Sequence, residues 1–217
     1  MKKIFFAGVV CAVSFGAHAQ GYFGVIRALT NVGFTCAPGD SCESKGQAWK
    51  FYGGTKLSPA RTIDFGVGKI DAVEVSYFRT SAATASGPTQ VDDFDSFGNI
   101  VQRDTTAKVK AQVDAIVLAG VARFPIVDQL SATAKLGLAY VSTTLRSEVD
   151  GLSYNSVTQT KLRPYVGLGV EYDIPSICTI VGSFDITRVD VSDSSRYYSA
   201  QAKGNLKLLG IGAQKSF

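Results

Sequence analysis

Apolar and polar residues alternate along much of this chain. Between residues 162 and 172, for example, Leu162 and Val166 occupy one set of alternate positions, and Arg163 and Glu171 occupy the other. Side chains of a strand point to opposite faces in turn, so the pattern predicts strands with one apolar and one polar face. The segments run for about ten residues or more, whereas strands of soluble domains average about five or six. Such lengths indicate strands that cross a membrane.

Eight segments show this alternation, an even number as in bacterial outer-membrane barrels. They cover residues 21–30, 47–57, 71–81, 105–124, 129–146, 159–173, 177–191 and 203–217. In lipid every backbone N–H and C=O must be paired, so strands can span a membrane only within a closed sheet. We therefore predict an all-β fold, an eight-stranded antiparallel up-and-down transmembrane β-barrel.

The connections between these segments alternate in length. Long polar connections cover residues 31–46, 82–104, 147–158 and 192–202, and tight ones with a proline cover 125–128 and 174–176. Long external loops and short periplasmic turns are the usual asymmetry of outer-membrane barrels. Residues 58–70 should form a periplasmic turn but are too long for one, and the sequence leaves their structure open.

The N-terminus has the features of a secretory signal peptide. Lys2 and Lys3 precede an apolar stretch, and Ala17-His18-Ala19 forms an A-x-A cleavage site. The apolar stretch is too short to span a bilayer, which needs about 20 apolar residues. A lipoprotein anchor on Cys11 is the competing interpretation, which we set aside because a valine precedes the cysteine. We expect residues 1–19 to be removed and residues 20–217 to form the barrel.

Signal-peptide removal would leave little chemistry for an enzyme. The single histidine, His18, would be lost, and general acid–base catalysis near neutral pH favours imidazole. We therefore expect a protein that is not an enzyme, with no cofactor and no catalytic or structural metal. Asp92, Asp93 and Asp95 could hold a divalent cation loosely, but an exposed acidic loop is the favoured interpretation. The remaining 20 basic and 18 acidic residues give no indication of a nucleic-acid partner.

Three short motifs resemble the transmembrane domain of the outer-membrane protein A (OmpA) family. Residues 123–137, RFPIVDQLSATAKLG, resemble a strand–turn–strand of that family, and residues 167–175 and 72–77 resemble two strands with inward glutamates. The resemblance implies a Gram-negative outer-membrane location and inward positions for Glu74 and Glu171. Phe217 resembles the terminal aromatic residue that the barrel-insertion machinery reads. The chain departs from the family at two basic lumen positions, which fall on Val121 and Val181.

The alternation also predicts which charged side chains point into the barrel. Eight-stranded barrels are narrow and filled by side chains. Isolated buried charges cost several kcal/mol, so we expect the inward charges to form a connected ion-pair network that closes the lumen. The phase that we assign to the first strand also turns Phe23 inward. The predicted network consists of Arg27, Lys50, Glu74, Asp114, Lys135 and Glu171.

Three cysteines would remain after cleavage. Cys36 and Cys42 flank Pro38-Gly39, which favours a tight reversal, and the compartment is oxidising. We expect a disulfide between them, with two free thiols as the alternative. Cys178 is expected to be an unpaired, packed small hydrophobe.

Two functions fit these features. The first is a structural and surface-interaction barrel that displays four external loops to host or environmental ligands, with outer-membrane lipid and the insertion machinery as further partners. The second is a small passive channel, porin-like, for ions or small solutes. Mixed charge in the lumen favours the first, because paired charges plug a pore. On the C-terminal strand we expect Leu209, Ile211, Ala213 and Phe217 to face lipid, with Lys215 at the periplasmic interface.

Overall fold

The computed structural model describes residues 21–33, 41–58, 62–64, 69–81, 83–94, 99–149, 152–195 and 198–217. The regular elements in these ranges are β-strands, and no helix there is long and apolar enough to cross a membrane. The strands are β1 (Gly21–Val32), β2 (Ser41–Glu43), β3 (Lys45–Lys56), β4 (Ile63–Asp64), β5 (Lys69–Thr80), β6 (Ala83–Phe94), β7 (Ile100–Val127), β8 (Leu130–Val149), β9 (Leu152–Ile174), β10 (Cys178–Ser195) and β11 (Tyr198–Ser216). The expected signal peptide, residues 1–19, lies outside the described ranges.

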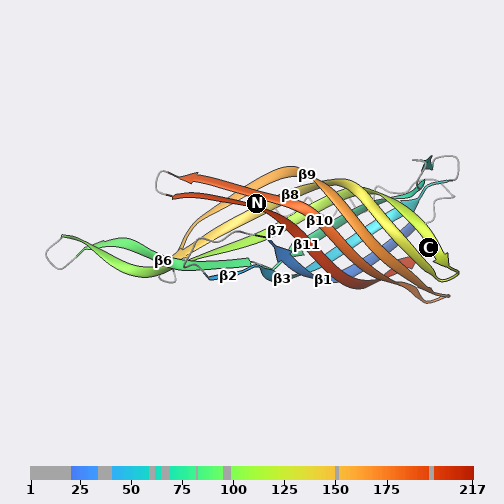
Figure 1. The fold of residues 1–217 in the computed structure, drawn as a ribbon, viewed down its shortest axis with the longest axis horizontal. Coiled ribbons are helices and arrows are strands. Elements are labelled where there is room, and N and C mark those ends of the chain that lie inside the picture. Colours follow the sequence, from blue (N-terminus) through green and yellow to red (C-terminus); the bar gives the residue numbers. More distant parts are fainter. Residues whose placement is uncertain are drawn as a thin grey trace.

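Eight of these strands close into a ring. β1 pairs with β3 and with β11, β3 pairs with β5, and β5 pairs with β7. From β7 to β11 each strand pairs with the next one in the chain. Each of these pairings is antiparallel, and Figure 1 shows the strands tilted around a common axis. A closed ring leaves no unpaired edge within a membrane, and the predicted eight-stranded barrel is confirmed.

The observed strands extend further than predicted at one end of the barrel. β7 begins at Ile100 and β9 begins at Leu152, so both reach into segments that we predicted as loops. β6 pairs with the first part of β7, and β2 adds to the other edge of β6. Residues 58–70, whose structure the sequence left open, contain the short β4, which pairs with the beginning of β5.

The two ends of the barrel differ, and we call them the turn end and the loop end. The turn end holds Gly21, Phe217 and the tight β7–β8 and β9–β10 connections. In the second connection the backbone N–H of Ile177 donates to the carbonyl of Ile174 at 3.1 Å, and Ser176 has a φ of 66°. Proline followed by a residue of positive φ is the pattern of a type II turn. At the loop end, β6 and the first part of β7 project beyond the barrel as a ribbon (Figure 1).

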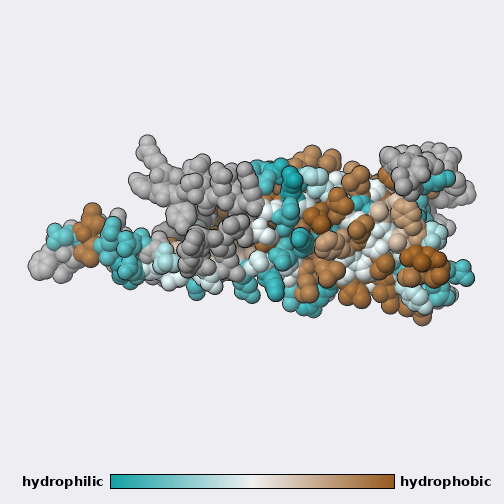
Figure 2. All heavy atoms as spheres, in the orientation of Figure 1, coloured by the Kyte–Doolittle hydropathy of each residue, from teal (hydrophilic) through white to brown (hydrophobic). Residues whose placement is uncertain are grey.

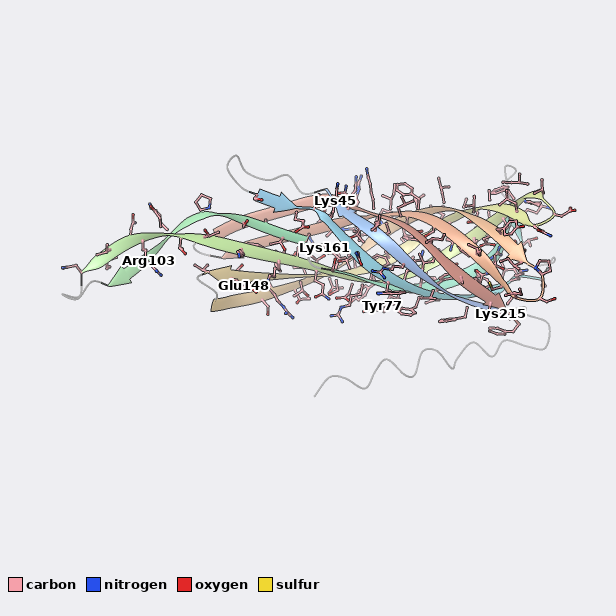
Figure 3. The ribbon with its side chains drawn as sticks, turned by 90° about the horizontal axis from the view of Figure 1, so that it is seen from below. Lys45, Tyr77, Arg103, Glu148, Lys161 and Lys215 are labelled. Carbon is pink, nitrogen blue, oxygen red and sulfur yellow. The ribbon has the colours of Figure 1, made fainter. Side chains whose placement is uncertain are left out.

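An apolar band covers the outer surface of the ring. Figure 2 shows hydrophobic side chains gathered over the half of the barrel near the turn end, with hydrophilic residues toward the loop end. The most exposed members include Leu118, Leu136, Leu138, Leu162, Leu168, Leu209 and Ile211. Leu209, Ile211, Ala213 and Phe217 face outward as predicted. Lys215 lies at the turn end (Figure 3), where its Nζ donates to the carbonyl of Ile177 at 2.7 Å.

The lumen is filled by side chains of unequal size. β7 contributes small and medium apolar residues to it, among them Ala115, Val117 and Ala119. Tyr22 and Tyr52 are buried there with their ring centroids 6.3 Å apart. Glycines opposite these rings on the neighbouring strands make room for them, because a Cβ on Gly54 or Gly24 would overlap a tyrosine ring. The interior is therefore occupied by tyrosines, small residues and the charged groups described next.

Candidate functional site

Four of the six predicted lumen residues point into the barrel. Lys50 of β3, Glu74 of β5, Lys135 of β8 and Glu171 of β9 are buried, with exposed fractions between 1% and 7%. They lie on four different strands, and the ring brings them together across the lumen. The structure thus places these four residues on the lumen side of their strands.

Arg27 is the first correction, because its side chain points outward. The inward residues of β1 are Tyr22, Gly24, Ile26, Ala28, Thr30 and Val32. Both faces of this strand carry apolar residues, so the alternation does not tell which face is the lumen face. The prediction placed the arginine inside and thereby assigned the wrong face to the lumen. Arg27 instead donates through NH2 to Oε1 of Gln47 at 2.7 Å and lies over the ring of Trp49, 5.5 Å from its centroid.

Asp114 is the second correction, since it too points outward. Its Oδ1 accepts from Nε of Arg79 at 3.1 Å and from the hydroxyl of Tyr77 at 2.9 Å. The inward row of β7 runs through Val113 and Val121. The polar residues of β7 near Asp114 lie toward the loop end, beyond the apolar band. There the outer surface of the barrel contacts water, so a polar side chain can point outward as well as into the lumen.

The lumen clusters described below contain two charged residues that were absent from the predicted network. Asp185 of β10 is buried, and Arg123 of β7 has only 12% of its side chain exposed. The signal for Arg123 was present in the sequence, because the family resemblance places Val121 in the lumen and Arg123 lies two positions further on the same face. Asp185 shares the polar face of its strand with Ser183 and Thr179.

The first charged cluster contains Lys50, Asp185, Tyr165 and Ser183. Nζ of Lys50 donates to Oδ2 of Asp185 at 2.9 Å and to the hydroxyl of Tyr165 at 2.8 Å. The Tyr165 hydroxyl donates to Oδ1 of the same aspartate, and Oγ of Ser183 donates to Oδ2 at 3.3 Å. Both carboxylate oxygens of Asp185 are thus hydrogen-bonded, so the buried charges are compensated.

The second cluster is the ion pair between Lys135 and Glu74. Nζ of Lys135 donates to both carboxylate oxygens, at 2.8 and 2.7 Å, and lies 4.9 Å from the centroid of the Tyr52 ring. The hydroxyl of Tyr22 donates to Oε2 of Glu74 at 3.4 Å. The Tyr52 hydroxyl continues the network to Oε1 of Gln214 at 3.2 Å.

The third cluster lies near the turn end. Nε of Arg123 donates to Oε2 of Glu171 at 3.0 Å, and NH1 reaches Oδ1 of Asp71 at 3.4 Å. Its guanidinium also stacks on the ring of Tyr22, 5.1 Å from the centroid. Tyr22 therefore contacts Arg123 with its ring and Glu74 with its hydroxyl, which joins the second and third clusters.

Two members of the predicted network, Arg27 and Asp114, thus lie outside the lumen, and Asp185 and Arg123 lie within it. Three basic side chains, Lys50, Lys135 and Arg123, each meet a carboxylate. A buried charge left without its partner typically costs about 3–5 kcal/mol, so such an arrangement favours one fixed set of pairs. Chemically, the network fills the cross-section of the barrel with groups that hold one another in place.

The described residues include only some of the cysteines and loop aspartates for which we made predictions. Cys178 is a free cysteine, half-buried at the beginning of β10. Cys36 and the side chain of Cys42 lie outside the described residues, so their disulfide stays a prediction. The side chains of Asp92, Asp93 and Asp95 also lie outside them.

Comparison with known proteins finds a family model that matches part of the chain. The model of the OmpA-like transmembrane domain matches residues 92–195, which include β7, β8, β9 and β10 of the closed ring. The chain is therefore OmpA-like over these residues, and its closed ring is that of an outer-membrane β-barrel. Its location is therefore the outer membrane of a Gram-negative bacterium. In bacterial outer-membrane barrels the short turns face the periplasm and the long loops face the outside.

Solved structures similar to the OmpA-like barrel are also outer-membrane proteins. Neisserial surface protein A has 13% sequence identity and a TM-score of 0.49, with 91% of this chain and 97% of that one covered. Ail of Yersinia pestis, in complex with the heparin analogue sucrose octasulfate, has 11% identity and a TM-score of 0.49, with 92% and 100% covered. The N-terminal barrel of OprF of Pseudomonas aeruginosa has 11% identity and a TM-score of 0.37, with 91% and 99% covered. No curated protein matches the chain.

Proposed function

We propose that this chain is a non-enzymatic membrane anchor with a closed lumen, which presents its loop end to ligands outside the cell. The observation that carries the proposal is the lumen network, in which Lys50, Lys135 and Arg123 are each held by a carboxylate. Fixed ion pairs across a narrow barrel oppose the passage of ions and solutes. The alternative function, a small passive channel, requires these pairs to separate for much of the time.

The projecting ribbon supports the surface-interaction part of this proposal. β6 pairs with β7 from Ala83–Ala111 out to Phe94–Ile100, whereas the pairing of β7 with β8 ends at Ala107. Beyond that point both outer edges of the two-stranded ribbon lack a described partner strand. Ile100 and Val101 are exposed near its tip. Free strand edges and exposed apolar side chains are features by which proteins bind partners.

Shortening the ribbon tests the proposed role directly. Replacing residues 88–106 with Asn-Gly, which favours a tight hairpin turn between the paired residues Gly87 and Ala107, should leave the barrel folded, because the ring does not depend on these residues. We expect unchanged heat-modifiable migration in gels and a loss of most barrel-dependent adhesion of bacteria to serum-coated surfaces. A strain that lacks the barrel sets the baseline. Full adhesion of the shortened form would contradict a role for the ribbon.

A further inference from the structure

A groove lies on the outer wall of the barrel, away from the lumen network. Its lining is Gln47, Trp49 and Phe51 of β3 with Arg79, Thr80 and Ser81 at the end of β5, and its volume is about 640 Å³. Trp49 and Phe51 are half-exposed and belong to the apolar band, whereas Arg79 has 62% of its side chain exposed. The groove therefore crosses the boundary at which the apolar band ends and the polar loop end begins.

Two arginines flank Trp49 on this wall. Arg27 of β1 is the register partner of Trp49, and Trp49 is in turn the register partner of Arg79. Directly opposite residues of neighbouring strands have Cβ atoms about 5 Å apart, so the three side chains form one short row. Trp49 is the middle residue of this row, and the guanidinium of Arg27 lies over its ring.

The positive charge of this row is only partly compensated. Arg79 is paired with Asp114 on the side of β7. Arg27 has a neutral hydrogen-bond partner, the amide oxygen of Gln47, and no carboxylate of the described residues forms an ion pair with it. An uncompensated guanidinium on the lipid-facing side of a barrel is unfavourable unless it reaches the membrane interface or finds an anion there.

We propose that the groove binds the phosphate group of an anionic lipid in the outer leaflet. The guanidinium groups of Arg27 and Arg79 match a phosphate, since arginine presents several N–H donors in one plane. The apolar side chains of Trp49, in the same row, and of Phe51, two residues nearer the turn end, suit the adjoining acyl chains. A second copy of this barrel fits less well, because a two-fold contact through this row would bring like charges together.

Trp49 provides a local reporter, because it is the only tryptophan of the chain. The refolded barrel, in nanodiscs of phosphatidylcholine, is titrated with diphosphoryl lipid A while its emission is recorded. We expect a saturable change. The double variant Arg27→Gln, Arg79→Gln should need about tenfold more lipid or above, because a hydrogen bond to a charged group contributes on the order of 1.5–3 kcal/mol. Arg103→Gln makes the same change of charge on the projecting ribbon, far along the molecule from Tyr77 of β5 (Figure 3), and should behave as the wild type.

Three results would overturn the proposal. They are an emission change without saturation, an unchanged lipid requirement in the double variant, and an equal response to dephosphorylated lipid A or to inorganic phosphate alone. Heat-modifiable migration verifies that each variant is folded. Because loss of Arg27 alters the surroundings of Trp49, mass spectrometry of lipid retained during purification provides a second readout. Wild-type barrel should retain more phosphorylated lipid than the double variant, and equal retention would contradict the site.

Discussion

Glu74→Ala is expected to lower the free energy of unfolding by about 3–5 kcal/mol, because it leaves a buried ammonium group without its carboxylate. Nζ of Lys135 loses both of its short contacts with the carboxylate, at 2.8 and 2.7 Å, and keeps its contact with the ring of Tyr52. Urea unfolding of the refolded barrel in micelles measures the loss. The same variant should show more frequent channel openings than the wild type.

Two matched variants separate this effect from general damage. Glu74→Ala combined with Lys135→Met removes both charges and should recover most of the lost stability, since apolar replacement of a buried pair is often close to neutral. Asp114→Ala removes an outward carboxylate whose partner, Arg79, is largely exposed, and should cost less than about 1 kcal/mol. A Glu74→Ala loss no larger than that of Asp114→Ala would contradict the importance of the buried pair.

Deletion of Phe217 is expected to reduce recovery of the barrel from the outer membrane by about tenfold or more, since burial of a phenylalanine side chain contributes on the order of 1.5–3 kcal/mol. The Phe217 side chain lies on the outer surface of the barrel with 82% of its area exposed. The backbone N–H of Phe217 donates to the carbonyl of Gly21 at 3.0 Å. We propose that the insertion machinery reads this terminal aromatic residue together with the outward row of β11. Quantitative blotting of outer-membrane fractions measures the recovery.

The conservative change Phe217→Tyr is the control for this deletion. It keeps an aromatic ring at the terminus and should preserve recovery. Lys215→Ala removes a neighbouring side chain whose Nζ contacts the carbonyl of Ile177, and should also have little effect. Normal recovery of a heat-modifiable barrel without Phe217 would contradict the assignment of the terminal residue as an insertion signal.

The barrel could be predicted from the sequence because its strands repeat one pattern over a long stretch. Leu162, Val166 and Leu168 face lipid while Tyr165 and Glu171 face the lumen, as the alternation requires. The same argument placed Lys50, Glu74 and Lys135 inside. Where one face is apolar throughout and the other contains charges and glycines, the phase of a strand is unambiguous.

The phase could not be assigned where the surroundings of a strand change along its length. β7 passes from the water-exposed ribbon into the membrane, so that Asp114 is polar for a reason unrelated to the lumen. In β1 the lumen face holds Tyr22 and Ile26, and the lipid face holds Arg27. The rule that polar residues face the lumen and apolar residues face lipid is therefore reversed in this strand, because its arginine lies at the membrane interface and its lumen residue Ile26 is apolar. The specific partners of each charge required the register of the closed ring.

Single-channel conductance of the purified, refolded wild-type barrel in a planar bilayer tests the central claim most directly. If the network of Lys50, Asp185, Lys135, Glu74 and Arg123 closes the lumen, the barrel should be silent most of the time, with brief and small openings. Paired charges in a narrow lumen separate only at a cost of several kcal/mol. Steady, large currents through the wild-type protein would contradict a closed lumen and would identify the chain as a channel.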